Sequence, residues 1–361
     1  MEQAAPRIAV VGLGLIGGSI ALAARERLGA RVSGYDTSEP ALRAAAARGA
    51  IERQAGNVAD AVCDAAAVFL AVPVGSLPAL VAEALNVAPE DCVITDVGST
   101  KRAVVTAGDD PRFVGGHPLA GAETSGIEHA RPDLFEGATW YLTPGPRTSG
   151  VLYERLHRLL RALGARPAAI DAEAHDAILA NVSHLPHVLA NVLVQQAGQV
   201  LAQRDARLPA TGPSFRDATR VAGSPSAVWT DIYLSNADAL GEAVQRMIAG
   251  LEELHDALAR RDGRWIADWN DRAAVDRRRL LEAQLAGEAL FELRLSVPNR
   301  PGVVAQVALE LGRAGVNIVD MALYPAPDMS EGVIALWVAG EAHAERAQAL
   351  ASSLGFPAVL A

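Results

Sequence analysis

The sequence predicts an α/β protein built from a doubly wound sheet, an all-α domain and a C-terminal βαββαβ module. Apolar strand-like runs alternate with helix-like runs from residue 7 to about 171, which favours a parallel sheet covered by helices on both faces. From about 173 this alternation gives way to long helical runs, and short strands return near 287. We therefore predict domains at 1–171, 172–286 and 287–361.

The first domain opens with the strand RIAVVGLG and the helix LIGGSIALAARERLG. The pairs RVSGYD with EPALRAAAARG, and AAVFLAVP with SLPALVAEALN, repeat the alternation, and CVITDVGS, RFVGGHP and TWYLTP continue the strands. The run AEAHDAILANVSHLPHVLANVLVQQAGQVLAQ is apolar on more than one face, which indicates burial in a helical domain or against a second subunit. NADALGEAVQRMIAGLEELHDALARRDG is a second long helix, with amphipathic spacing.

A glycine motif lies between the first strand and the first helix. Gly12 permits a tight turn, Gly14 lets the backbone approach a pyrophosphate, and Gly17 lets the helix pack closely on the strand. Asp36 ends the second strand about 20 residues later, where a carboxylate binds ribose hydroxyls of NAD and repels the 2′-phosphate of NADP. A glycine-rich turn without a nucleotide is the alternative. The predicted NAD-binding set of this Rossmann-type domain is Gly12, Gly14, Leu15, Ile16, Gly17, Asp36, Val72 and Pro73.

Two polar residues follow neighbouring strands of the predicted sheet. Ser99 follows CVITDV and His117 follows RFVGG, and ligands of open α/β sheets gather at the carboxyl ends of strands. A serine hydroxyl beside a neutral imidazole could orient the ring and leave its other nitrogen to accept a proton. Ser99 alone is equally consistent with an N-cap for the turn that begins at Thr100.

The helical region carries two further pairs. His184 and His187 form HxxH, but no acidic residue or third histidine stands at metal spacing, so we predict no metal and keep core histidines as the alternative. Arg216 and Arg220 share one face if the segment is helical. One of them could then bind a carboxylate through two parallel hydrogen bonds, and a solvated surface pair is the alternative.

Composition excludes several classes of partner. The net charge of −10 argues against nucleic acid and anionic membranes, and the basic run DRRRL at 276–280 fits a solvated helix face. Cys63 and Cys92 belong to no CxxC pair and fit buried cytosolic thiols. The apolar stretch near the N-terminus is shorter than the ~20 residues that span a bilayer. We expect a soluble, cytoplasmic protein.

Five motifs occur here in the order in which they occur in the prephenate dehydrogenase family of tyrosine biosynthesis: VVGLGLIGGS, DVGSTK, GGHPLAGAETSG, VSHLPH and FRDATR…SP…W. The chain resembles that family over roughly residues 7–286. VPNRPGVVAQV and GVNI resemble an ACT domain, an amino-acid-sensing module. The resemblance implies NAD-dependent oxidative decarboxylation of prephenate to 4-hydroxyphenylpyruvate.

The same resemblance implies roles for individual residues. His117 would accept the proton of the 4-hydroxyl as hydride leaves C4, Ser99 would orient His117 and the substrate, and Gly115–Gly116 would avoid crowding the nicotinamide. Glu123 and Asp176 would pair with and gate substrate-binding arginines, while His184 would be structural. The implied substrate-binding set is His187, Arg220, Glu123, Asp176 and Trp229.

The C-terminal module is expected to bind an amino acid, with tyrosine first. A glycine-rich strand-to-helix turn exposes N–H groups suited to a carboxylate. The predicted effector set is Asn299, Gly302, Asn317 and Ile318, at a place where two copies meet. We also expect a homodimer formed through the helical domain.

Three alternatives remain open. Arogenate or 4-amino-4-deoxyprephenate would keep the chemistry and change the substrate. A catalytically inactive amino-acid-binding regulator would keep the fold, although Ser99, His117, His187 and Arg220 are all present. A hydroxy-acid or 6-phosphogluconate-type dehydrogenase would want a lysine near 181–187, where none occurs.

Overall fold

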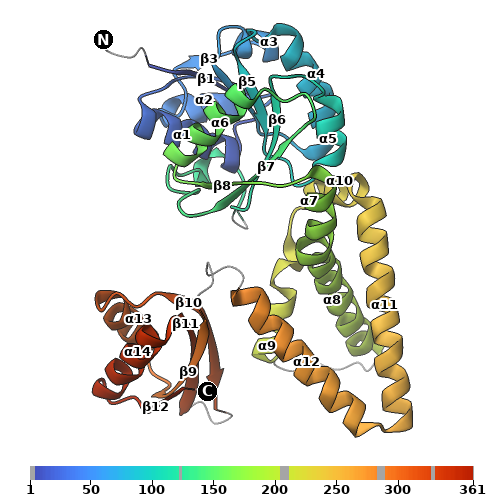
Figure 1. Ribbon diagram of the computed structural model, residues 1–361, viewed down its shortest axis with the longest axis vertical. Coiled ribbons are helices and arrows are strands. Elements are labelled where there is room, and N and C mark those ends of the chain that lie inside the picture. The colour runs from blue at the N-terminus through green and yellow to red at the C-terminus, as the bar shows by residue number, and fades with distance from the viewer. Residues whose placement is uncertain (1–4, 122–123, 204–210, 283–288, 327–329, 361) are drawn as a thin grey trace. The chain divides into compact units, whose positions relative to one another are not determined.

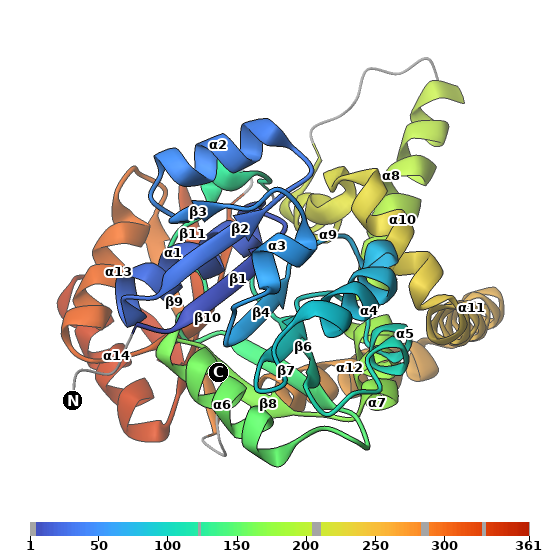
Figure 2. The ribbon, with the colours of Figure 1, turned by 90° about the horizontal axis from the view of Figure 1, so that it is seen from above.

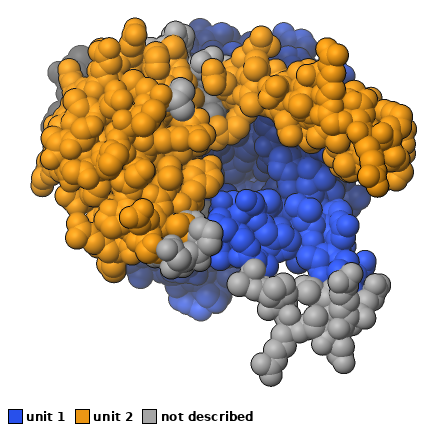
Figure 3. All heavy atoms as spheres, turned by 90° about the horizontal axis from the view of Figure 1, so that it is seen from below, with its two compact units in different colours: residues 1–248 blue, residues 249–361 orange. Residues whose placement is uncertain are grey.

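The structure is a computed structural model that describes residues 5–121, 124–203, 211–282, 289–326 and 330–360 (Figure 1). The chain forms two compact units, residues 1–248 and 249–361 (Figure 3). The division falls inside helix α11 (Ala237–Arg260), so it differs from the three predicted domains, whose boundaries remain a prediction.

The first unit contains an eight-stranded sheet in the order β3-β2-β1-β4-β5-β6-β7-β8. The strands are β1 (Arg7–Val11), β2 (Arg31–Tyr35), β3 (Arg53–Gln54), β4 (Ala67–Leu70), β5 (Val93–Asp96), β6 (Phe113–Pro118), β7 (Thr139–Pro144) and β8 (Arg166–Ala169). The strands from β3 to β6 pair in parallel, which confirms the predicted Rossmann-type sheet.

Strand β7 departs from the predicted series because it runs antiparallel to β6. A parallel return needs a crossover, usually a helix. The described residues between β6 and β7 contain only the short 3₁₀ helix η2 (Ile127–His129), so the chain turns back directly.

Helices cover both faces of the sheet because both faces are apolar. In β1, Ile8 and Val10 join one hydrophobic cluster, while Ala9 and Val11 join another, as the period of a strand requires. Helices α1 and α6 lie on one side of the sheet, and α3, α4 and α5 on the other (Figure 2). The helices are α1 (Leu15–Leu28), α2 (Glu39–Ala47), α3 (Val58–Val62), η1 (Val74–Ser76), α4 (Leu77–Val87), α5 (Arg102–Ala107) and α6 (Gly150–Ala162).

The predicted helical region follows, with one interruption. A π-turn, η3 (Ala180–His184), divides the first long run into α7 (Ala172–Leu179) and α8 (Leu185–Gln203). Such turns are frequent at functional sites. The remaining elements are α9 (Pro213–Thr219), η4 (Arg220–Gly223), α10 (Ser226–Ser235), α11 and α12 (Gly263–Glu282).

The run Ala172–Val200 is the one described helix that is long and apolar enough to cross a membrane. That test considers length and composition only, and core helices of soluble proteins and signal sequences also pass it. Several of its apolar side chains are exposed in the single chain: Ile178, Val182, Val192, Leu193, Val194 and Val200.

The C-terminal part has the predicted βαββαβ pattern. Its antiparallel sheet has the order β10-β11-β9-β12, and one face packs on its two helices through Leu293, Leu295, Leu336 and Val338. The elements are β9 (Leu290–Pro298), α13 (Val303–Arg313), β10 (Ile318–Pro325), β11 (Glu331–Ala339), α14 (Glu341–Ser353) and β12 (Ala358–Leu360).

The expectation that both cysteines are buried is wrong. Cys63 is exposed, because it follows the last residue of the short helix α3, whereas Cys92 is buried and burial raises the pKa of its thiol to about 12. The basic run 276–280 is an exposed face of helix α12, as expected, and Arg277 also makes contacts from it. Its guanidinium lies 4.8 Å from the ring centroid of Trp337 and 3.0 Å from a carboxylate oxygen of Asp320.

Packing inside the sheet, not the cofactor, explains Gly115–Gly116. A Cβ on Gly115 would lie 2.2 Å from Oγ1 of Thr143. A Cβ on Gly116 would lie 2.5 Å from the carbonyl oxygen of Asp96 and 2.7 Å from Oγ1 of Thr95. The expectation that these glycines make room for the nicotinamide is therefore wrong.

We predict that Gly116→Ala destabilises the protein, because the new methyl group overlaps a neighbouring strand that cannot yield. Overpacking of this kind costs about 1–3 kcal/mol. Urea unfolding of full-length protein measures the change. Gly150→Ala at the start of α6 is the matched control, since nothing lies within 4 Å of its added Cβ. Equal destabilisation by both substitutions would contradict the packing explanation.

Candidate active site

A cavity of about 700 Å³ in the first unit adjoins the carboxyl ends of the parallel strands. Its walls come from the glycine turn, the segments after β4, β5 and β6, the π-turn, η4 and α10. The predicted site residues that line it are Gly14, Leu15, Ile16, Val72, Pro73, Ser99, Arg220 and Trp229.

The glycine turn has the geometry that the motif predicts. Gly12 has φ +91°, and a Cβ there would lie 2.2 Å from the carbonyl oxygen of Ala71. A Cβ on Gly17 would lie 1.9 Å from the carbonyl oxygen of Gly12, so helix α1 approaches the turn very closely. At Gly14 a Cβ would meet nothing within 4 Å, which leaves open space in front of the helix N-terminus.

Asp36 is held rigidly just beyond β2. Its Oδ2 accepts a hydrogen bond from the backbone N–H of Leu13 at 2.7 Å, and its Oδ1 accepts one from the N–H of Ser38 at 2.7 Å. The carboxylate therefore joins the end of β2 to the glycine turn.

His117 belongs to a buried chain of three side chains. Its Nδ1 lies 2.9 Å from Nε2 of His175, and Nδ1 of His175 lies 2.8 Å from Oδ1 of Asp176. Because a carboxylate only accepts hydrogen bonds, Nδ1 of His175 donates and Nε2 of a neutral His175 accepts. Nδ1 of His117 must then donate, which leaves the lone pair of a neutral His117 on Nε2.

This chain corrects the expected role of Ser99. We expected Ser99 to orient His117, but His175 takes that position, and no hydrogen bond joins Ser99 to His117 among the described residues. Sequence reasoning did not single out His175. The adjacent pair His175–Asp176 in the apolar run is the signal that was available, and only folding brings it against β6.

Asp176 also differs from expectation. It was expected to pair with a substrate-binding arginine, yet it accepts hydrogen bonds from the backbone N–H groups of Lys101 at 2.7 Å and Arg102 at 3.0 Å. Its Oδ2 also lies 3.5 Å from Nε of Arg102, not beside Arg220.

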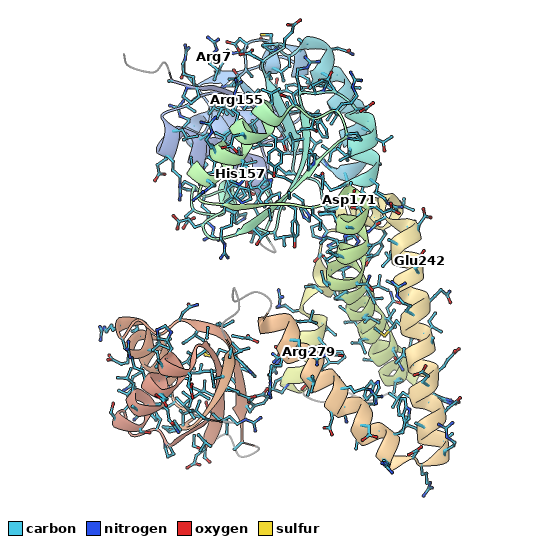
Figure 4. The ribbon with its side chains drawn as sticks, viewed as in Figure 1. Arg7, Arg155, His157, Asp171, Glu242 and Arg279 are labelled. Carbon is cyan, nitrogen blue, oxygen red and sulfur yellow. The ribbon has the colours of Figure 1, made fainter. Side chains whose placement is uncertain are left out.

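Asp171, at the start of α7 (Figure 4), anchors the helix by accepting hydrogen bonds from the N–H groups of Glu173 and Ala174. Glu123 lies outside the described residues.

Burial and hydrogen bonding determine the protonation states of His117 and Asp176. Desolvation, then the charges of His175 and Lys101, hold the pKa of His117 well below 6.5, so the imidazole is neutral. Burial alone would raise the pKa of Asp176, but hydrogen bonds from His175 and from the backbone of Arg102 and Lys101 lower it overall. An ionised Asp176 carboxylate and a neutral His117 imidazole thus lie at the two ends of this hydrogen-bonded chain.

The helical side of the site is aromatic. His187 stacks on Trp229, with ring centroids 3.6 Å apart, and its Nδ1 is hydrogen-bonded to the hydroxyl of Tyr233. His184 contacts the side-chain amide of Asn236 through Nδ1, at 3.2 Å. Among the described residues, Nε2 of His184 is buried without a hydrogen-bond partner, whereas His187 is also hydrogen-bonded to the backbone of Val221.

The two arginines of the FRDATR segment separate. Arg216 is exposed and donates to the carbonyl oxygen of Thr211, whereas Arg220 begins η4 and lines the cavity. One arginine of the pair thus faces a ligand-sized space, as the spacing suggested.

The predicted effector residues lie at two ends of the C-terminal sheet. Asn299 follows β9 beside a cavity of about 190 Å³, and Gly302, with φ +91°, precedes α13. Ile318, next to Asn317, pairs with Val338, which is the β11 partner of Phe291 at the opposite end of β9. The length of a strand therefore separates the two pairs within one chain, and the effector set at a place where two copies meet remains a prediction.

We predict that His184 makes stability depend on pH. Burial lowers the pKa of His184 to about 4, against 6.5 as its ordinary value. Between these values the unfolded chain binds a proton that the folded chain does not, so the free energy of unfolding falls as pH falls through this window. His184→Phe should flatten that slope in urea unfolding at several pH values. His255→Phe, at an exposed site, is the control that should leave it unchanged, and an unaltered slope in His184→Phe would refute the assignment.

The sequence matches two family models in succession. The nucleotide-binding domain of prephenate dehydrogenase matches residues 20–169, and the dimerization domain of prephenate dehydrogenase matches residues 171–269.

Curated proteins and solved structures agree with these matches. The chain is 33% identical to the prephenate dehydrogenase of Bacillus subtilis over 96% of both chains, and 36% identical to the cyclohexadienyl dehydrogenase of Zymomonas mobilis over 72% of this chain and 91% of that one. It is similar to the prephenate dehydrogenase of Aquifex aeolicus in complex with hydroxyphenyl propionate and NAD⁺, with a TM-score of 0.69 and 26% identity over 78% of this chain and 100% of that one. A Synechocystis arogenate dehydrogenase has a TM-score of 0.65 at 27% identity, over 75% of this chain and 98% of that one. The order of the motifs, the fold and these relatives together establish that the chain belongs to the prephenate dehydrogenase family.

Proposed function

We propose that this chain is an NAD-dependent prephenate dehydrogenase, which converts prephenate to 4-hydroxyphenylpyruvate and CO₂ in tyrosine biosynthesis. The observation that carries the proposal is the buried chain Asp176–His175–His117. It leaves a neutral imidazole nitrogen as proton acceptor on the strand that leads into the cavity-lining residues 120–121.

The glycine turn fits NAD. Close packing at Gly12 and Gly17, with open space at Gly14, is what a pyrophosphate at a helix N-terminus requires. Leu15, Ile16, Val72 and Pro73 are proposed to line the cofactor, and Asp36 to bind its ribose. Bound NAD accepts the hydride.

The cavity also fits a dicarboxylate with a ring. Arg220 is proposed to bind a substrate carboxylate, and Trp229 to flank the ring. His187, which stacks on Trp229, is proposed to contact the substrate as well. Ser99 lines the same cavity. It is proposed to contact the substrate, and it does not orient His117.

The proton follows a short path. Nε2 of His117 takes the proton of the 4-hydroxyl while C4 loses its hydride, and the hydrogen bond to His175, itself bonded to Asp176, stabilises the imidazolium. Loss of CO₂ from C1 then makes the ring aromatic and leaves a phenolate oxygen. His117 can return the proton to that oxygen, so the step releases no net proton.

The relatives favour prephenate as the substrate, because the chain is 33% identical to a prephenate dehydrogenase over 96% of both chains. Arg220 lines the cavity, and Glu123 lies outside the described residues. The relatives include both prephenate and arogenate dehydrogenases, so arogenate stays the alternative substrate. A regulator without catalysis has less support, since it has no use for the His117–His175–Asp176 chain.

We predict that purified protein reduces NAD with prephenate faster than with arogenate, as measured by NADH absorbance. His117→Asn should bind NAD normally but lose about 10²- to 10⁴-fold in kcat, the usual contribution of a general base. No NADH from either compound would overturn the proposed function. A kcat for His117→Asn within a few-fold of wild type would remove His117 from its role.

The helical region is proposed to form a homodimer. Exposed apolar side chains along α8 need cover in water, and the matched family model is a dimerization domain. A dimer interface explains the apolar helix without a membrane. The protein is proposed to act in the cytoplasm, as expected of a biosynthetic enzyme.

The C-terminal module is proposed to bind tyrosine between two copies of the chain. The cavity beside Asn299 is lined mainly by apolar side chains, including Val303, Leu323 and Tyr324, which suits an aromatic ring. Asn317 lies too far along the sheet to reach that cavity in the same chain, so the partner's copy would contribute it.

We predict that tyrosine weakens prephenate binding roughly 5- to 150-fold, the usual range of allosteric coupling. Asn299→Ala and Asn317→Ala should each abolish tyrosine binding in calorimetry. If sites are shared between copies, a mixed dimer of the two variants has one intact site and one doubly altered site, so mixing should restore part of the binding. If mixing the two variants restores no tyrosine binding, the shared site is refuted. If the wild-type protein binds no tyrosine, the role of tyrosine as effector is refuted.

A further inference from the structure

An ion pair lies fully buried beside His117. Nζ of Lys101 donates a hydrogen bond to Oδ2 of Asp96, and neither side chain has exposed surface. Nζ of Lys101 also donates to the carbonyl oxygen of Gly116 at 2.7 Å, while Oδ1 of Asp96 accepts from the N–H of Gly116 at 3.0 Å. The pair therefore holds both polar groups of the residue before His117.

The end of β5 explains why side chains do this. β5 pairs with β6 only as far as Thr95 and Val114, so beyond that point the backbone of β6 lacks a β5 partner on this side. Asp96 and Lys101 take the place of that partner. Oδ2 of Asp96 also accepts from the N–H of Gly98 at 2.8 Å, which joins β6 to the turn that carries Ser99.

Stability alone does not account for this arrangement. Desolvation of two charges offsets most of their attraction, and apolar replacements of buried pairs are often neutral or stabilising. The hydrogen bonds converge instead on the two residues that precede His117 and Ser99, namely Gly116 and Gly98.

We propose that Asp96 and Lys101 are positioning residues for the proton acceptor, which they hold by fixing the Gly116 peptide against the turn at Gly98. The inference rests on the role proposed above for His117. It assigns the pair no contact with substrate or cofactor.

The positive charge of Lys101 also affects the pKa of His117. The ionisable groups that act on His117 are His175 on α7, Lys101 after β5 and His184 in the π-turn, with Asp176 behind His175. Burial and the charge of His175 lower the pKa of His117, and the cation of Lys101 lowers it further. Without that cation the pKa of His117 rises.

The test compares Lys101→Met, Asp96→Asn and the double variant, which fills the space without charges. The matched control is Asp110→Asn with Arg112→Met. That ion pair, 2.9 Å between Nε and Oδ1, fastens the opposite end of β6 to the carbonyl oxygens of Leu85 and Ala88. The measurements are kcat and KM with prephenate, the pH profile of kcat/KM, the titration of His117 by imidazole NMR, assigned through His117→Asn, and the free energy of unfolding in urea.

Lys101→Met should lower kcat by about 10²-fold, the effect of roughly 1 Å of misplacement, with a much smaller change in KM. In Lys101→Met, the acidic limb of the pH profile of kcat/KM and the NMR titration of His117 should both move to higher pH. The double variant should recover stability in urea but not kcat, and the control should lose stability with kcat unchanged.

Wild-type kcat and His117 titration in the double variant would overturn the proposal. A matching loss of kcat in the control would also overturn it, because the effect would then be general loosening of β6. The NMR titration needs no substrate. If wild type oxidises neither prephenate nor arogenate, the proposed function fails, while the titration still decides whether Lys101 controls His117.

Discussion

Every polar group at the carboxyl end of β6 needs a partner, although the neighbouring strand stops short of it. β5 ends at Asp96, and the N–H and carbonyl groups of Gly116 are satisfied by Asp96 and Lys101. A backbone group left unpaired there would cost about 1–3 kcal/mol. The same requirement fixes the direction of β6 where it delivers His117 to the site.

One carboxylate joins the sheet to the helical region within the first unit. Asp176 binds the N–H groups at the start of α5, and it also orients His175 against His117. Buried Asn236 donates to the carbonyl oxygen of Asp176 and meets His184. Packing of the helical region and alignment of the proton acceptor are thus one hydrogen-bond network, so a change in either affects the other.

The cavity has one side formed by the loops of the sheet and another formed by the helical region. The glycine turn lines the sheet side of the cavity, and strand β6 carries the neutral His117. Arg220 and Trp229 line the helical side of the cavity, and His187 stacks on Trp229; these residues are proposed to bind the ring and a carboxylate of the substrate. A base that stays neutral in a buried place can take a proton near neutral pH, and burial is what keeps it neutral.

The sequence alone determined the Rossmann-type sheet, the helical region, the βαββαβ module and the glycine turn, because each follows from local periodicity or from residues a few positions apart. It also indicated His117 and Arg220, which stand at a strand end and at helical spacing. Only the tertiary structure decided three features. Strand β7 runs antiparallel to β6, His117 is hydrogen-bonded to His175 and not to Ser99, and Asp176 binds the backbone of Lys101 and Arg102. The tertiary structure also decided the separation of Asn299 from Asn317. These features join residues distant in the chain, and a hydrogen bond between such residues is decided by how strands and helices pack, which no local pattern encodes.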